Sequence, residues 1–139
     1  MKLLLASLAA AACLFALPAQ ADEAESVAKA QAATTTWLAL TDSGKYGESW
    51  DTAAQLFKDA GVRSAWENAI RGVRAPLGAL VSRKLKSAKF TRSLPGAPDG
   101  EYVVIQYDTA YKNKASAVET LTPMRDKDGA WRVAGYFIK

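Results

Sequence analysis

Hydrophobic residues in the first half of the chain recur every three or four positions. Two such sets carry aromatic anchors: Tyr46, Trp50, Ala53 and Phe57, then Trp66, Ile70, Val73 and Leu77. Residues with this spacing fall on one stripe of an α-helix. With the alanine-rich stretch before them, they predict three helices, at 22–41, 46–58 and 64–74. Three β-branched residues in a row, Thr34–Thr36, are the weak point of the first helix.

Local signals set the expected ends of these helices. Ser64 and Glu67 have the spacing of a capping box, which makes Ser64 the expected N-cap of the third helix. Pro76 disfavours a helical residue before it, so this helix is expected to stop or break near Ala75.

The pattern changes to that of strands from about Val81. Strands are expected at 83–94, 102–111, 116–124 and 131–138; the second places Val103, Ile105, Tyr107, Thr109 and Tyr111 on one face. The expected connections are a loop at 94–100 rich in Pro and Gly, a turn at 112–114, and a hairpin turn at 126–129 that ends in Asp128-Gly129. Helices followed by closely spaced strands predict an α+β fold, with three N-terminal helices packed on a four-stranded, curved antiparallel sheet in meander order.

The first 21 residues have the anatomy of a secretory signal peptide. Lys2 is followed by an apolar run over 3–17, then by Pro18 and the small-x-small site Ala19-Gln20-Ala21. We expect cleavage after Ala21, a single domain over 22–139, and location in the periplasm. An uncleaved anchor is disfavoured because the run is shorter than the roughly 20 residues that span a bilayer.

The amino-acid composition argues against several kinds of catalytic and binding site. The chain has no histidine, and its single cysteine, Cys13, lies in the leader, so the mature chain would have neither disulfides nor a nucleophile–histidine pair. Loss of Lys2 leaves 17 basic and 14 acidic residues, a net charge of +3, which argues against a nucleic-acid binder. No metal, cofactor or second membrane segment is expected, and Asp126–Gly129 is expected to be a hairpin turn rather than a calcium loop.

Glu119 is the most unusual carboxylate. It lies between Ala117 and Leu121 on an otherwise apolar strand face. Buried, it needs a basic or hydroxyl partner, which Arg71, Arg74, Arg83 or Tyr107 could supply. A raised-pKa base or ligand anchor is one interpretation; the other, which we favour, is a structural role, either as an ion pair or as an edge-facing solvated residue.

Two other features have both structural and functional interpretations. The basic stretch Arg83–Arg92 has five positive charges and no negative one. It could dock on anionic lipid or polysaccharide, or simply protect an edge strand from self-pairing, which we favour. The aromatic residues could line a ligand pocket, although this spacing is more typical of a core: Trp37, Trp50, Trp66, Tyr107 and Trp131.

Motifs along almost the whole mature chain resemble an uncharacterised family of exported bacterial proteins, domain of unknown function 4019. They are Trp37–Leu40 with Asp42, Tyr46–Trp50, Phe57-Lys58, Trp66, Arg74, Leu77-Gly78, Ser82-Arg83, Leu94–Gly96, Gly100–Val104, Glu119-Thr120, Asp128-Gly129, Trp131–Val133 and Gly135-Tyr136. The resemblance implies an envelope protein and supplies no activity, cofactor or catalytic residue. The order of helices and strands is also similar to the cone-shaped folds of the nuclear-transport-factor-two-like and cystatin-like group, an analogy of fold alone.

The sequence therefore favours a non-enzymatic module of the envelope that binds a small ligand or another envelope protein. The alternative is a small enzyme that uses Glu119 as base or anchor in a pocket between helices and sheet. The expected ligand-binding residues are Trp50, Arg74, Arg83, Tyr107 and Glu119.

Overall fold

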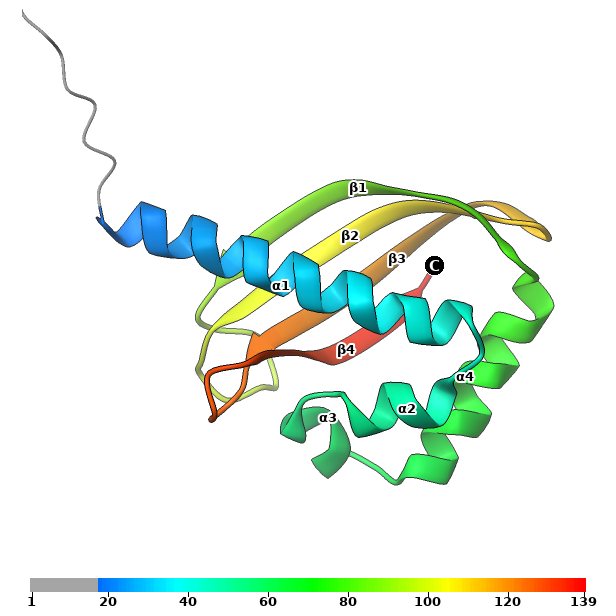
Figure 1. Cartoon of the computed structure of the whole chain (residues 1–139), viewed down its shortest axis with the longest axis horizontal. Coiled ribbons are helices and arrows are strands. Elements are labelled where there is room, and N and C mark those ends of the chain that lie inside the picture. The colour runs from blue at the N-terminus through cyan, green and yellow to red at the C-terminus, as the bar shows by residue number, and fades with distance from the viewer. Residues whose placement is uncertain (1–17) are drawn as a thin grey trace, which may run out of the picture.

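A computed structural model describes residues 18–139 and shows helices laid against one antiparallel sheet (Figure 1). The helices are α1 (Pro18–Asp42), α2 (Tyr46–Asp51), α3 (Gln55–Asp59) and α4 (Arg63–Leu77). The strands are β1 (Leu80–Thr91), β2 (Tyr102–Tyr111), β3 (Lys114–Arg125) and β4 (Trp131–Ile138). Their order in the sheet is β1-β2-β3-β4, and every neighbouring pair is antiparallel. The predicted α+β class and meander are confirmed.

The predicted leader falls outside the described residues except for Pro18–Ala21, which form the first turn of α1. Cys13 is among the residues outside. None of the helices within residues 18–139 is both long enough and apolar enough to cross a membrane.

The long helix α1 lies across one face of the sheet, and the strands bend as they pass it (Figure 1). Its buried residues recur at helical spacing and form the stripe that faces the sheet: Ala30, Thr34, Trp37, Leu38 and Thr41. They meet buried residues from the facing strands, including Val103, Ile105 and Leu121. In the threonine run, Thr34 is buried in this stripe, whereas Thr35 and Thr36 are exposed and donate back to the carbonyls of Gln31 and Ala32.

Residues 18–139 contain four helices, so the prediction of three was wrong. The stretch expected as one helix from Tyr46 to Lys58 is divided into α2 and α3 by a short linker. Ala54 adopts an extended backbone there, is fully buried, and donates its N–H to the Val133 carbonyl on β4 at 2.9 Å. Docking of the linker on the outer edge of the sheet therefore overrides local helical spacing.

Two expected ends of α4 were also wrong. Its N-cap is Val62, with no side-chain cap, and Ser64 lies inside the helix. Pro76 does not stop the helix, which runs to Leu77; in the last turn a proline removes only one hydrogen bond. Gly78, at φ 75°, ends it instead.

Buried Ser49 connects α2 to the two long helices. Its carbonyl accepts the indole N–H of Trp37 at 2.8 Å, and its hydroxyl accepts that of Trp66 at 3.0 Å. Both indoles can therefore be buried or half-buried without an unpaired donor. Ser49 thus joins Trp37 and Trp66 at one junction between the helices and the sheet, which we call the tryptophan junction.

Candidate functional site

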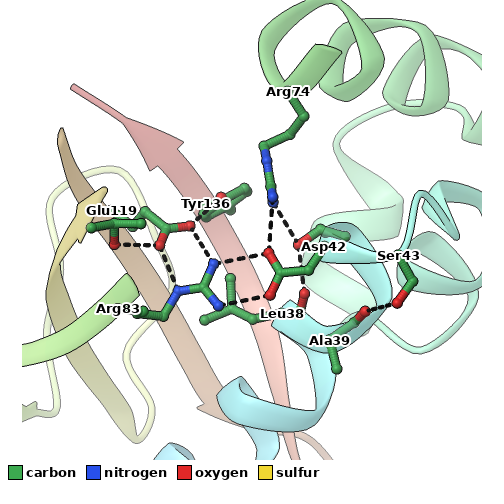
Figure 2. A network of polar contacts seen from close by, with 10 residues as sticks. Leu38, Ala39, Asp42, Ser43, Arg74, Arg83, Glu119 and Tyr136 are labelled. Atoms are coloured by element: carbon green, nitrogen blue, oxygen red, sulfur yellow. Dashed lines mark hydrogen bonds and ion pairs between the residues drawn. The ribbon is translucent and has the colours of Figure 1, made fainter. Parts of the chain in front are cut away.

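Four charged residues form a chain of ion pairs where the end of α1 meets the sheet (Figure 2). They alternate in sign in the order Arg74, Asp42, Arg83 and Glu119, and we refer to them as the ion chain. They come from α4, α1, β1 and β3. The chain therefore joins the two longest helices to the sheet, and its geometry depends on the fold of the whole domain.

Glu119 is at the buried end of the ion chain and is fully inaccessible to solvent. It accepts two hydrogen bonds from Arg83, at 2.6 and 3.1 Å, and one from the Thr109 hydroxyl at 2.6 Å. The Tyr136 hydroxyl on β4 donates a fourth. A carboxylate has about four lone-pair sites, so Glu119 is fully satisfied by groups of its own chain.

Arg83 is the centre of the ion chain. Besides its two hydrogen bonds to Glu119, Arg83 donates to both carboxylate oxygens of Asp42, at 2.8 and 3.0 Å. Asp42 also accepts from Arg74 at 2.9 Å, and Arg74 donates to the Thr41 hydroxyl at 3.2 Å. The Arg74 guanidinium lies 5.0 Å from the ring centre of Tyr111, within cation–π range.

The pKa values of both carboxylates are lowered. Burial by itself would raise the pKa of Glu119, but the hydrogen bonds from Arg83, Thr109 and Tyr136 outweigh it. Burial also opposes the shift at Asp42, where the two arginines prevail and hold its pKa below the usual range. The carboxylate of Glu119 also contributes, after burial, to raising the pKa of the Tyr136 phenol.

This arrangement does not favour Glu119 as a general base. A base of neutral-pH chemistry needs a raised pKa and a free lone pair within reach of the substrate. Glu119 has a lowered pKa, four donors on its oxygens and no exposed surface. The geometry matches that of a structural ion pair, one of the two structural roles favoured from the sequence.

A groove lies between α2, α3, α4 and β4, and Trp66 of the tryptophan junction is one of its lining residues. Its volume is about 560 Å³. Its aromatic wall is formed by Trp50, Phe57 and Trp66, whose neighbouring rings meet edge to face at 5.5 and 4.8 Å. None of its lining residues carries a charge: Trp50, Leu56, Phe57, Ala60, Gly61, Val62, Ala65, Trp66, Ala69, Gly96, Ala134, Gly135 and Tyr136. We call this the aromatic groove.

The five residues expected to form one ligand site are therefore found in three places. Arg74, Arg83 and Glu119 come together in the ion chain, and Trp50 lies apart from them in the aromatic groove. Tyr107 is a core residue that faces Glu119 across the β2–β3 register without a hydrogen bond to it.

Sequence reasoning missed Asp42, Thr109 and Tyr136 as partners of these residues. The strand alternation that placed Thr109 on the same face as Tyr107 was a usable signal for the hydroxyl. No comparable signal pointed to Asp42 or Tyr136, because both reach the site through tertiary packing. Arg71, which had been considered as a partner of Glu119, instead donates to Asn68 and lies over Tyr46.

Residues 33–136 match a protein family described as a protein of unknown function, DUF4019. The chain belongs to the DUF4019 family. The matched region contains all four residues of the ion chain and all the residues that line the aromatic groove. No curated protein and no solved structure matches the chain. The likeness of this DUF4019 protein to the nuclear-transport-factor-two-like group therefore stays a prediction.

The residues that carried the resemblance to DUF4019 include Asp42, Arg74, Arg83, Glu119 and Tyr136. These five residues are far apart in the sequence but in contact in the structure. Four of them form the ion chain, and Tyr136 donates a hydrogen bond to Glu119 at its buried end. Within residues 18–139 of this DUF4019 protein, no group of three or more potential metal-ligating side chains is found.

Proposed function

We propose that the chain is an exported protein of the periplasm that binds a small, uncharged, apolar molecule in the aromatic groove, without catalysis. The observation that carries this proposal is the lining of the groove, which contains aromatic and small apolar residues and no charged side chain. A volume of about 560 Å³ lies in the range of small-molecule sites, roughly 300–1,000 Å³.

A small molecule suits the groove better than a protein partner. A specific protein interface buries roughly 800 Å² on each side and gains orientation from a polar rim. The aromatic groove instead offers the edges and faces of three neighbouring rings, against which a flat apolar molecule can pack.

The side chains of the groove support binding rather than catalysis, because the groove meets the ion chain through Tyr136 and not through a charged residue. Tyr136 is the one lining residue with an ionisable side chain, and its hydroxyl donates to Glu119. Its pKa is raised, by burial first and by Glu119 second, so the phenol stays protonated at neutral pH. A bound molecule would therefore meet no proton acceptor among the side chains of the groove.

The groove is tested with the neutral fluorescent probe N-phenyl-1-naphthylamine. We expect saturable binding by the unmodified chain and at least a roughly tenfold weaker affinity in Ala65→Arg, because this change places a charge in an apolar groove. Ala65 is exposed on α4, so the substitution leaves the core unchanged. Ala75→Arg is the matched control, since Ala75 is exposed on the same helix and outside the groove.

Equal affinities in the two arginine variants, or no saturable binding by the unmodified chain, would contradict the proposal. Tryptophan emission gives a second measurement, because Trp50 and Trp66 both line the groove and should respond to its occupant.

Export rests on the apolar leader and the Ala19-Gln20-Ala21 site. We expect a chain that begins at Asp22 in a periplasmic extract of the producing cell, as determined by intact mass. A chain of full mass retained in the cytoplasm would contradict this part of the proposal.

A further inference from the structure

The strand β1 forms the edge of the sheet opposite β4, away from α2 and α3, and follows α4 after a two-residue connection (Figure 1). Its basic stretch is divided by the structure into two groups. Arg83 points inward to Asp42 and Glu119, and Arg92 lies 3.6 Å from Glu101. The other three basic residues are exposed and form no ion pair with any residue that the structure describes: Lys84, Lys86 and Lys89.

Apolar side chains interrupt these lysines along the same edge. Val81 is 68 % exposed and Leu85 is 48 % exposed, and both are among the large hydrophobic residues that the fold leaves in solvent. Lys84 and Leu85 point to opposite faces of the sheet, since Lys84 pairs with exposed Asp108 and Leu85 with buried Tyr107, so lysine and aliphatic side chains flank the β1 rim from its two sides. A purely polar partner would cover the lysines and leave these two side chains without a favourable environment.

The edge is also unsuited to adding another strand. Register shifts interrupt β1 between Leu80 and Ser82 and again between Leu85 and Ser87. Bulges and edge lysines both oppose pairing with a second chain, and a second copy of this chain would add like charge. Edge protection explains the lysines and the bulges, but it does not explain two exposed aliphatic residues beside them.

The geometry points to a broad, flat partner. Lys84, Lys86 and Lys89 are exposed to solvent and do not line the aromatic groove. Lysine is a flexible point charge that suits diffuse contact with many head groups, whereas arginine suits paired contact with one phosphate. The nearest acidic neighbour in the register is Asp108, opposite Lys84, and it offsets part of one charge.

We propose that the β1 edge docks on an anionic lipid bilayer, with the three lysines near the head groups and Val81 and Leu85 at the interface. This function is separate from the aromatic groove, which lies beside β4 at the other edge of the sheet. Each lysine close to an anionic membrane strengthens binding by roughly fivefold, so the three together account for roughly a hundredfold.

Co-sedimentation with vesicles tests this docking surface. The chain that begins at Asp22 is mixed with vesicles of phosphatidylcholine alone, or with about 30 % phosphatidylglycerol, at low and high salt. We expect binding only to the anionic vesicles, weakened by salt, and lowered by roughly a hundredfold in the triple variant K84Q/K86Q/K89Q. Leu85→Ser should lower the part of the binding that resists salt.

A second triple variant, K45Q/K58Q/K127Q, is the matched control. It removes the same net charge from residues near α2, α3 and the β3–β4 turn, and we expect it to keep most of the affinity. Equal losses in both triple variants would show an effect of net charge alone and overturn the proposal. So would equal binding to both vesicle types.

Two further outcomes assign the edge to another role. Binding to heparin beads without binding to anionic vesicles would replace the lipid surface by an anionic polysaccharide. Self-association of K84Q/K86Q/K89Q on a sizing column, with vesicle binding unchanged, would reduce the lysines to edge protection. Circular dichroism confirms that each variant is folded before it is scored.

Discussion

Replacing Arg83 by methionine is expected to lower the free energy of unfolding by about 3–5 kcal/mol, since it leaves buried carboxylates without their cation. Arg83 is the only residue that bonds to both Asp42 and Glu119 in the described part of the chain. Glu119 is fully buried and cannot exchange its lost partner for water. Urea unfolding at pH 7, followed by tryptophan emission, measures the change.

Arg63→Met is the matched control for this prediction. Arg63 also forms an ion pair, with Asp51, but both side chains are about half exposed. Exposed pairs contribute about 0–1 kcal/mol, so this variant should be nearly as stable as the parent. Similar losses in the two variants would show that burial does not distinguish the ion chain from a surface pair.

The same comparison across pH tests the direction of the pKa shifts. The pKa values of Asp42 and Glu119 are lowered in the folded protein from ordinary values of 3.8 and 4.5. The unfolded chain therefore binds more protons in this range, so stability rises with pH and is fully present above about pH 5. It is lost as pH falls through the folded pKa values. Glu119→Gln, which cannot ionise, should remove part of this acid dependence; an unchanged acid profile would contradict the assignment.

Deletion of the last four residues, Tyr136–Lys139, is expected to cost several kcal/mol of stability or to prevent folding. It removes buried apolar surface, the hydrogen bond from Tyr136 to Glu119 and the backbone pairing of Lys139 with Val118. Tyr136 packs edge to face on Trp37, with ring centres 5.2 Å apart, and donates to Glu119. The backbone of Lys139 pairs with Val118 in both directions at 2.9 Å. Thermal melting of the shortened chain measures the loss.

A pair of neighbouring substitutions separates burial from chain length. Tyr136→Ala should reproduce most of the loss, at about 3–5 kcal/mol. Phe137 is 54 % exposed, so Phe137→Ala should cost well under half as much. Unchanged melting of the shortened chain would show that the end of β4 contributes nothing to the core.

The strands could be predicted from the sequence because their signal is local. Alternating side chains and Asp128-Gly129 gave the last strand its observed bounds, Trp131–Ile138. The first strand was displaced by three residues, from Arg83–Leu94 to Leu80–Thr91. Its basic stretch lacks the alternation of apolar and polar residues from which the ends of a strand are predicted. Two bulges also shift its register against β2.

The helical block was less predictable because tertiary contacts override its spacing. The linker at Ala54 is extended and donates its N–H to a carbonyl of β4, a contact that local spacing does not predict. In α4 the residue spaced as part of the apolar stripe, Val73, is 47 % exposed, whereas its neighbour Arg74 is buried. An arginine that stacks on Tyr111 and pairs with Asp42 takes the core position that a hydrophobic pattern assigns to valine.

The candidate site shows the same division between local and tertiary information. A carboxylate on an apolar strand face was sufficient to single out Glu119 and to predict a basic or hydroxyl partner. Which of several arginines supplied it depended on the β1–β2 and β2–β3 registers, which bring Arg83 and Glu119 to adjacent places beside Thr109. Periodicity alone does not contain that information.

The seating of Ala54 on β4 also affects how copies of this protein can aggregate. A sheet with two bare rims can add molecules at both and grow into a filament of unlimited length. Here the amide of Ala54 binds the Val133 carbonyl of β4, so the α2–α3 linker covers that rim at this point, while the bulges and lysines of β1 oppose pairing at the other rim. Fibrous growth through the β4 rim would first require the linker to detach.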